Sequence, residues 1–350
     1  MKNNMTSKNR LALCLTRYSF NIRKGLDYVD IAIPTIGKND VQVQIVAAGL
    51  NPIDYKMVYG MALPIFSPKR PFPIAYDFSG IIIGKGDNVV KFNPGDRIYG
   101  KVPWHQIGTI TSTTSVNEQM IGLAPKTISL IDAAAMPLVA CTAMEAFEYA
   151  KPQLGAKVLI IGGSGGLGTF LIQYAKFKGC KVTATASPKN VDFVKTLSPD
   201  EIVDYTNKLV MNRLRNFDVV FDTVGGSYPW RSVSWVKRGG KIITLAGHHD
   251  QETLKQIDFS KLLRIAFYIK GIPLMARMNK RSIKYKHVWS TPHADRLNQL
   301  TELIDDGIIE PVIDRIYPFE KAIDALEYLE TKRARGKVIV QILELKDAYE

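Results

Sequence analysis

Cysteine is scarce in this chain: there are three among 350 residues, Cys14, Cys141 and Cys180. No two of them stand in the C-x-x-C spacing of structural zinc sites and redox motifs. The sequence therefore excludes a disulfide framework and a structural zinc lobe. Thiols outside any such framework are typical of a reducing compartment, and we expect a cytoplasmic protein.

Long apolar runs are also missing. The longest nearly uncharged segment, residues 133–144, contains Pro137 and is shorter than the about 20 apolar residues of a membrane-spanning helix. The apolar piece at residues 11–15 is too short for a signal peptide. The sequence thus predicts neither a membrane span nor a secretory leader.

Acidic residues are absent from one long segment of a chain whose formal net charge is +13. Between Lys261 and Trp289 every charged side chain is basic: Lys261, Arg264, Lys270, Arg277, Lys280, Arg281, Lys284 and Lys286. A patch of this kind attracts anions. The favoured interpretation is a solvated rim around a phosphate-bearing ligand, and the alternative is a contact with RNA, an anionic membrane or a partner.

The remaining composition, with 46% hydrophobic and 23% charged residues, is that of an ordinary globular protein. A chain of this length most often forms two domains. Up to about residue 125, short β-patterned runs are broken by Gly, Pro and Asn, which indicates a β-rich, partly open barrel. From Lys157 onward, strand and helix patterns alternate, which predicts a doubly wound parallel sheet. The expected strands are residues 158–161, 182–186, 201–204, 218–221, 241–245 and 267–272.

The most informative feature is a glycine cluster between the apolar run 158–161 and the amphipathic run 170–178. Gly163, Gly165 and Gly168 stand in G-x-G-x-x-G register, and a strand before and a helix after make this a dinucleotide-binding turn. We expect the first glycine to turn the chain, the second to admit a pyrophosphate and the third to let the helix pack closely. The helix N-terminus adds unpaired N–H groups and a partial positive charge. The residues expected to bind the cofactor here are Gly163, Ser164, Gly165, Gly166, Leu167 and Gly168.

The end of the second strand favours NADPH over NADH. An NAD site places an acidic residue here to accept from the ribose 2′-OH, whereas this strand ends in Ser187, Pro188 and Lys189. A hydroxyl and an ammonium suit a 2′-phosphate, and Tyr205 after the third strand can add a second hydroxyl. Ser187 is also a suitable N-cap for a helix with Pro188 in its first position, and the two roles are compatible.

In this order and spacing the motifs resemble the medium-chain dehydrogenase/reductase superfamily, and within it the zinc-free quinone oxidoreductase and alkenal (enone) reductase branch. The resemblance runs over nearly the whole chain. Gly49–Lys56 is similar to a G-x-N-P-x-D-x-K element, Tyr76–Gly80 to a D-x-x-G element, and Gly95–Gly100 to a G-D-R-V-x-G element. The further matching segments are residues 133–137, 142–143, 162–168, 187–190, 204–205, 221–222, 239–240 and 335–338.

The resemblance implies an α/β fold: an N-terminal GroES-like β-rich, partly open barrel and a Rossmann domain with a doubly wound, six-stranded parallel sheet. We expect residues 1–130 and 275–350 to form the catalytic GroES-like domain and residues 131–274 to form the dinucleotide-binding domain. Two segments depart from the family pattern: Leu197–Asp200 replaces a Gly-Ala pair, and Met275–Trp289 matches no element. The second lies where the family shapes its substrate entrance or its subunit contact, so the substrate stays open.

No metal site is expected. Where zinc alcohol dehydrogenases of the superfamily carry a Cys and a His-Glu pair, this chain has Asn51 and Tyr76-Asp77. Cys141 alone cannot form a site of three protein ligands, and we expect it to be a small buried residue. The histidines that lack metal-ligand spacing are His105, His248 and His249.

Conjugate reduction needs no metal, because charge builds on the carbonyl oxygen of an enone or quinone as hydride adds, and hydrogen-bond donors can stabilise it. The resemblance implies that Lys56 is this donor, since the branch carries a lysine here. The candidate catalytic residues are thus Lys56, Tyr55 and Asn51. Tyr55 is the alternative donor or a wall of the pocket, and Asn51 is favoured as a residue that holds the loop shape. Asp54 orients Lys56; the alternative is that Lys56 is a surface lysine or pairs with Asp54. The residues implied beside the nicotinamide are Thr142, Leu245 and Gly247, for which packing is the alternative role.

The function expected is that of a zinc-independent, NADPH-dependent oxidoreductase. It would transfer hydride to the activated double bond of an enone or enal, or to a quinone, so its substrate would be a small conjugated carbonyl or quinone. The alternative is an NADPH-binding protein whose basic segment 261–289 binds RNA, an anionic membrane or a protein partner. A homodimer is implied by the resemblance alone.

Overall fold

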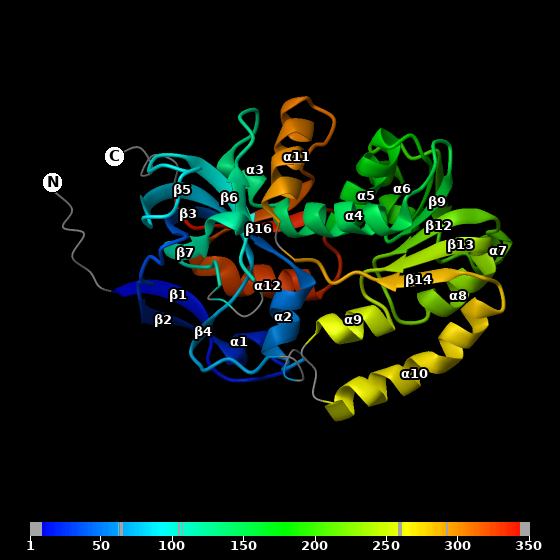
Figure 1. The fold of residues 1–350 in the computed structure, drawn as a ribbon, viewed down its shortest axis with the longest axis horizontal. Helices are drawn as coiled ribbons and strands as arrows, with labels where there is room; N and C mark the ends of the chain where they lie inside the picture. Colours follow the sequence, from blue (N-terminus) through cyan, green and yellow to red (C-terminus); the bar gives the residue numbers. More distant parts are fainter. Residues whose placement is uncertain are drawn as a thin grey trace. The chain divides into compact units, whose positions relative to one another are not determined.

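The structure is a computed structural model that describes residues 9–343, except residues 62, 64, 65, 104, 105, 107, 258–260 and 292. It contains two compact units (Figure 1). One comprises Met1–Leu138 and Pro292–Glu350, and the other comprises Val139–Thr291. His105, one of the histidines weighed as metal ligands, lies outside the described residues.

The first unit is built around a mixed seven-stranded sheet. Its order is β15-β16-β3-β5-β6-β8, and β7 also pairs with β3. The strands are β3 (Asp40–Leu50), β5 (Asp77–Lys85), β6 (Arg97–Lys101), β7 (Thr113–Asn117), β8 (Ile121–Leu123), β15 (Ile313–Pro318) and β16 (Lys337–Gln341). Because β16 pairs antiparallel with β3, the C-terminal part of the chain completes a sheet that the N-terminal part begins.

A three-stranded sheet in the same unit joins β1 (Asn9–Leu15), β2 (Leu26–Ala32) and β4 (Phe72–Pro73). The helices of the unit are α1 (Ile22–Gly25), α2 (Pro52–Val58), α3 (Leu130–Ala133), α11 (Ala294–Asp305) and α12 (Ala322–Glu330), with 3-10 turns η1 (Glu118–Met120) and η3 (Phe319–Lys321). Along β3, Val41, Val43 and Ile45 are buried and alternate with half-buried polar residues, the pattern of a strand with one face on a core. The expected β-rich GroES-like part is confirmed.

The second unit is a six-stranded sheet of order β11-β10-β9-β12-β13-β14, in which all neighbours are parallel. The strands are β9 (Lys157–Ile161), β10 (Lys181–Ala186), β11 (Glu201–Asp204), β12 (Phe217–Asp222), β13 (Val236–Thr244) and β14 (Lys284–His287). The chain runs outward from β9 to β11, then returns to β12 and runs to β14, which is the expected doubly wound topology. Val158–Ile161 of β9 are at most 1% exposed, as an apolar run in a central parallel strand requires.

Helices connect these strands. They are α4 (Pro137–Ala150), α5 (Gly166–Phe177), α6 (Val191–Lys195), α7 (Lys208–Arg213), α8 (Tyr228–Trp235), α9 (Gln251–Gln256) and α10 (Lys261–Asn279), with a 3-10 turn η2 (Pro188–Asn190). In Figure 1, α10 (yellow) runs along the outside of the unit, and it contacts α8, α9 and β14. Among the described residues, no helix has the length and apolar character needed to cross a membrane.

The sequence-based expectation of a strand at residues 267–272 is wrong, because these residues lie within α10. The sixth strand is β14, in which Lys286 is 8% exposed and pairs through its ammonium with Glu252. A strand with two lysines shows no apolar alternation, so the sequence did not reveal it. The unit boundaries, at 138/139 and 291/292, lie further along the chain than the expected 130/131 and 274/275. The second boundary is shifted because α10 and β14 place residues 275–291 in the second unit.

Candidate active site

The glycine loop between β9 and α5 turns at Gly162. This residue has a φ of +83°, in the left-handed region that favours glycine. The turn expected at Gly163 is therefore displaced by one residue. Gly163 instead lies close against β10, since a Cβ at this position would lie 3.1 Å from Ala184 Cβ. A Cβ at Gly168 would lie 2.1 Å from Gly162 O, which is the close helix approach that the sequence suggested.

The first turn of α5 leaves room for an anion. Gly165 is the N-cap, and the helix has neither a side-chain cap nor an acidic residue in its first turn. A Cβ at Gly165 would meet only Gly162 O, at 3.7 Å, so a ligand can approach the backbone here. The N–H groups of the first turn and the positive end of the helix dipole are thereby available to phosphate oxygens.

Thr185, near the end of β10, supports this loop and was missed by sequence reasoning. Gly162 N donates to Thr185 Oγ1 at 3.0 Å, and Gly163 N donates to Thr185 O at 2.9 Å. The residue is 1% exposed. The threonine between Ala184 and Ala186 was the available signal, since its hydroxyl needs a partner when buried.

The end of β10 carries buried polar atoms without a partner among the described residues. Ser187 is 8% exposed, and its Oγ is such an atom. Asn190 donates from Nδ2 to Ser164 Oγ at 3.1 Å, while its Oδ1 is a second such atom. A buried hydroxyl without a partner lowers stability unless a ligand satisfies it, so this edge fits a polar group such as a ribose phosphate.

Lys189 and Tyr205 lie at the same edge and are more exposed. Tyr205 N donates to Ala186 O at 3.2 Å, and its side chain is 42% exposed. The carboxylate in register with Ala186 is that of Asp204, which accepts from Thr206 N and Oγ1 at 2.8 and 2.7 Å. Ser187, Lys189 and Tyr205 therefore lie at one edge of the sheet, and their binding of the 2′-phosphate stays a prediction.

The turn after β13 follows the carboxyl end of a strand in the same sheet. Leu245 N donates to Asp222 O at 2.8 Å, and a Cβ at Gly247 would lie 2.5 Å from Thr244 Oγ1, so the turn is tightly held. Thr142 lies on α4 and is 7% exposed. The roles of Thr142, Leu245 and Gly247 beside the nicotinamide stay predictions.

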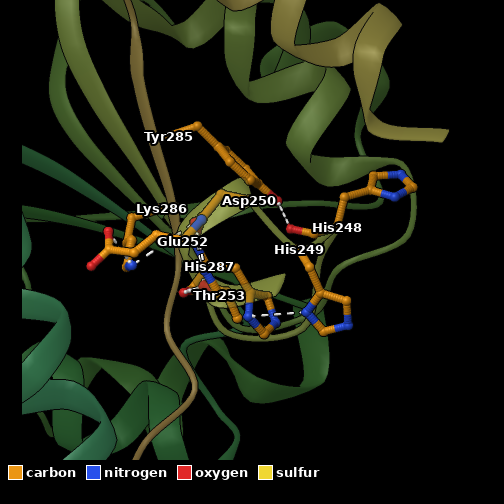
Figure 2. Close-up of polar contacts among 8 residues, drawn as sticks. All are labelled: His248, His249, Asp250, Glu252, Thr253, Tyr285, Lys286 and His287. Carbon is orange, nitrogen blue, oxygen red and sulfur yellow. Dashed lines mark hydrogen bonds and ion pairs between the residues drawn. The ribbon is translucent and has the colours of Figure 1, made fainter. Parts of the chain in front are cut away.

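A polar cluster lies just beyond this turn (Figure 2). Asp250 caps α9, because its Oδ1 accepts from Glu252 N and Thr253 N at 2.9 and 3.0 Å. Its Oδ2 accepts from His287 N on β14 at 2.6 Å. One carboxylate therefore joins the start of α9 to the edge strand of the sheet.

Histidines gather around Asp250, as Figure 2 shows. His249 Nδ1 and His287 Nδ1 are 3.4 Å apart, and Tyr285 OH donates to His248 O at 2.6 Å. Burial lowers the pKa of His287 to about 3 and also lowers the pKa of His249 and His248. Neutral imidazoles at this edge accept and donate hydrogen bonds without adding charge. Sequence reasoning missed this pairing, because its partners are 38 residues apart.

In the first unit, helix α2 begins with a closed cap. Asn51 is the N-cap, and Asp54 Oδ2 accepts from Asn51 N at 2.7 Å. Asp54 is fully buried, and burial raises its pKa to about 8. The expectation that Asp54 orients Lys56 is therefore wrong, because this carboxyl closes the cap. Lys56 is half-buried, and burial, followed by the nearby charge of Lys332, lowers the pKa of its ammonium.

Tyr55 is a core residue. It is 5% exposed and belongs to the hydrophobic cluster that includes Val58 and Leu326. Its ring meets that of Tyr59 edge to face, with centroids 5.8 Å apart. Burial raises the pKa of its hydroxyl. These contacts favour packing over hydrogen-bond donation to a ligand, so Lys56 is the better candidate on this helix.

The Asn51 side chain belongs to a buried polar group. Asn51 Nδ2 donates to Asp77 Oδ2 at 2.9 Å, and Lys337 Nζ donates to Asn51 Oδ1 at 2.5 Å and to Asp77 Oδ2 at 3.2 Å. Leu138 N donates to the other oxygen, Asp77 Oδ1, at 2.9 Å. The three residues are at most 4% exposed. Sequence reasoning saw Lys337 only as part of a terminal motif.

Comparison with known proteins matches both parts of the chain. The alcohol dehydrogenase GroES-like domain matches residues 37–135, and the zinc-binding dehydrogenase family matches residues 197–340. The 2-methylene-furan-3-one reductase of Solanum lycopersicum is 33% identical over 321 residues, which cover 89% of this chain and 74% of that protein. The chain belongs to the medium-chain dehydrogenase/reductase superfamily.

Two further relatives place it within the superfamily. The chloroplastic NADPH-dependent alkenal/one oxidoreductase of Arabidopsis thaliana is 31% identical, over 89% of this chain and 74% of that protein. The quinone oxidoreductase from Coxiella burnetii superimposes with a TM-score of 0.83 at 27% identity, over 96% of this chain and 100% of that one. This medium-chain reductase is therefore an oxidoreductase similar to the quinone and alkenal reductases, and the family, fold and enzyme class expected from sequence are confirmed.

The buried polar group of Asn51, Asp77 and Lys337 lies where other members of the superfamily hold zinc. At the positions where zinc alcohol dehydrogenases of the superfamily carry a Cys and a His-Glu pair, this reductase has Asn51 and Tyr76-Asp77. Lys337 donates to Asn51 and Asp77 together. Within the described part of the chain, no group of three or more His, Cys, Asp or Glu side chains is arranged to hold a metal ion.

Proposed function

We propose that this reductase works without zinc and uses NADPH to reduce the activated double bond of an enone or enal, or a quinone ring. The activities for which its relatives are named support the substrate class, because alkenals, alkenones, 2-methylene-furan-3-one and quinones all contain a conjugated carbonyl. Each accepts hydride at carbon while charge builds on oxygen.

The contact of Lys337 with Asn51 and Asp77 carries the zinc-independent part of the proposal. A fixed ammonium 2.5 Å from Asn51 Oδ1 and 3.2 Å from Asp77 Oδ2 competes for the oxygen atoms that a dication would need. Like charges repel strongly in a buried environment. The site also offers the Asn51 amide and the Asp77 carboxylate in place of the thiolate and imidazole ligands that zinc prefers. Conjugate reduction is compatible with such a donor set, because it needs hydrogen-bond donors at the carbonyl oxygen and no Lewis acid.

The second unit supports NADPH as the cofactor. The first turn of α5 would hold the pyrophosphate, and the Ser187 hydroxyl and the Lys189 ammonium would hold the 2′-phosphate. NADPH, when bound, supplies the hydride. No side-chain carboxylate stands in the Ser187–Asn190 segment, where NAD sites place one.

Lys56 is proposed to stabilise the oxygen anion. As hydride adds to the β-carbon, the double-bond electrons move toward the carbonyl, and an ammonium lowers the energy of the resulting enolate oxygen. The lowered pKa of Lys56 makes its ammonium a better proton donor. We also propose that the enzyme acts in a reducing compartment such as the cytoplasm, which the scarcity of cysteine supports, since the chain has three and all are buried.

The test is NADPH oxidation by the purified protein, followed at the nicotinamide absorbance with a panel of enals, enones and quinones. NADH serves as the parallel cofactor, and a chelator-treated sample serves as the metal control. Turnover with NADPH that survives chelation supports the proposal, and the best acceptor identifies the substrate class. Loss of activity on chelation with recovery on added zinc would refute zinc independence, and equal rates with NADH would refute the cofactor preference.

A further inference from the structure

Helix α10 presents a continuous aliphatic stripe to solvent. Four of its aliphatic side chains have exposed fractions of 81%, 47%, 58% and 45%: Leu262, Ile265, Ile269 and Ile272. Steps of three, four and three residues place them on one side of the helix. The small exposed residues on the same side are Ala266, Pro273 and Ala276. Aliphatic side chains exposed singly are ordinary, but a contiguous row of them marks a contact surface.

The opposite side of α10 is already covered. Gly271, Leu274 and Met278 are buried, and the last two belong to a hydrophobic cluster with Trp235 of α8. The helix is therefore apolar on two sides, and only one of these sides is covered by other residues of the unit. A helix that is apolar all round is typical of one that is buried on all sides.

Basic side chains border the stripe. At 100° per residue, Lys270 and Arg277 fall along one border and Lys261 along the other, and all three are exposed. Two other basic residues of the segment are held within the unit: Arg281 donates to Val233 O and Val236 O at 2.6 and 3.1 Å, and Lys286 pairs with Glu252. Lys280 and Lys284 are also exposed, so the outward positive charge of the segment lies on α10 and just beyond its end.

The charges and apolar side chains of this surface favour one binding partner among three: a second copy of the chain, single-stranded nucleic acid and an anionic bilayer. A two-fold contact between copies would bring the same patch together twice, and every charged side chain in it is positive. Single-stranded nucleic acid is held by basic groups and by several stacking aromatic rings, whereas the large exposed apolar side chains of α10 are four aliphatic ones and one aromatic one, Tyr268. The surface of an anionic bilayer offers phosphates to the borders and acyl chains to the stripe.

We propose that α10 binds the surface of an anionic phospholipid bilayer, with its aliphatic stripe in the interface and Lys261, Lys270 and Arg277 at the level of the phosphates. This inference does not rest on the proposed reductase activity, because binding to vesicles is measured without cofactor or acceptor. Where both hold, apolar conjugated carbonyls dissolved in the bilayer reach the enzyme directly.

The test is flotation of the whole protein with vesicles of phosphatidylcholine, alone or mixed with phosphatidylserine, at low and high salt. One variant removes the stripe: Leu262→Ser, Ile265→Ser and Ile269→Ser. A second variant reverses the borders: Lys261→Glu, Lys270→Glu and Arg277→Glu. The matched controls, at exposed positions elsewhere, are Val90→Ser, Leu154→Ser and Leu209→Ser for the first, and Lys181→Glu, Lys195→Glu and Lys208→Glu for the second. Melting temperatures establish that each variant is folded.

We expect the wild type to float only with phosphatidylserine present and to be released by high salt. Reversing the borders should weaken partitioning by about 100-fold or more, since each basic group near such a surface contributes a factor of about five. The stripe variant should also be released, whereas both controls should bind like the wild type. No binding, equal binding to phosphatidylcholine alone, or equal losses in the controls would overturn the proposal. A wild-type dimer that the stripe variant converts to a monomer in lipid-free sedimentation would also overturn it, by assigning the stripe to a second copy.

Discussion

Lys337 and Asp77 form a buried ion pair between residues 260 positions apart, with Lys337 Nζ 3.2 Å from Asp77 Oδ2. Their side chains are 5% and 0% exposed. The strands that carry them, β16 and β5, both pair with β3. The ion pair therefore lies at a point where both ends of the chain contribute to one sheet. Burial raises the pKa of Asp77, and the ammonium of Lys337 opposes that shift.

Removing Lys337 should destabilise the first unit. Lys337→Met leaves the Asp77 carboxylate buried without its cation, and we expect the free energy of unfolding to fall by about 3 to 5 kcal/mol. Urea denaturation measures the change. The double variant Lys337→Met with Asp77→Asn should recover part of the loss, because no uncompensated charge remains. Arg23→Ala, which removes an exposed ion pair with Asp324, is the control and should have a much smaller effect. Equal losses for Lys337→Met and Arg23→Ala would contradict this account.

His287 should make the protein sensitive to acid. Burial lowers its pKa from 6.5 to about 3 in the folded state. As pH falls below 6.5, the unfolded chain binds a proton that the folded chain does not, so stability is full above 6.5 and is lost progressively toward about 3. We expect His287→Asn to lose less stability than the wild type between pH about 7 and about 4.5, measured by urea unfolding at each pH. Parallel losses in the two proteins would show that His287 does not set the acid limit.

Gly168 should tolerate no side chain. A Cβ there would lie 2.1 Å from Gly162 O, so Gly168→Ala must push α5 away from β9. We expect a loss of about 1 to 3 kcal/mol in stability, together with weaker NADPH binding by fluorescence titration. Gly271→Ala in α10 is the matched control, because a Cβ there meets nothing within 4 Å. This control should gain up to about 1 kcal/mol, the usual difference between alanine and glycine in a helix.

Lys56→Ala should lower kcat with little change in the KM for NADPH, because it removes a contact made mainly in the transition state. We expect a loss of about 100-fold or more in kcat, the usual effect of deleting one oxyanion donor. Lys38→Ala, at an exposed lysine of the same unit, is the control. Tyr55→Phe keeps the core packing and should leave kcat unchanged. The reverse pattern, in which Tyr55→Phe lowers kcat and Lys56→Ala does not, would assign the donor to Tyr55.

Ser187→Ala combined with Lys189→Ala should reduce the preference for NADPH over NADH by about tenfold or more, since hydrogen bonds to charged groups contribute about 1.5 to 3 kcal/mol each. The ratio of kcat/KM for the two cofactors is the measurement. Lys195→Ala, at an exposed lysine in α6, should leave the ratio unchanged. A ratio that the double variant does not alter would move the 2′-phosphate site elsewhere.

Local features could be predicted from sequence because their partners are close along the chain. The glycine register of 163–168 lies between an apolar run and an amphipathic run, and those flanks alone define strand, turn and helix. The residues at the end of β10 are equally local, so Ser187, Lys189 and Tyr205 could be placed at one edge from the order of the strands. The error of one residue in the turn, Gly162 for Gly163, reflects backbone geometry that the motif does not specify.

The two-part fold and the cofactor loop could be predicted from sequence because apolar periodicity and glycine spacing act over a few residues, and the family could be predicted from the order of motifs that resemble it. The tertiary structure was needed for the remaining features. It brought Lys337 to Asn51 across 286 positions, paired His249 with His287, and buried Lys286 in a strand beside Glu252. It also made residues 267–272 part of a helix with one covered face and one exposed face. In each case the burial that fixes the role of a residue comes from elements distant in the chain, and no local pattern records those contacts.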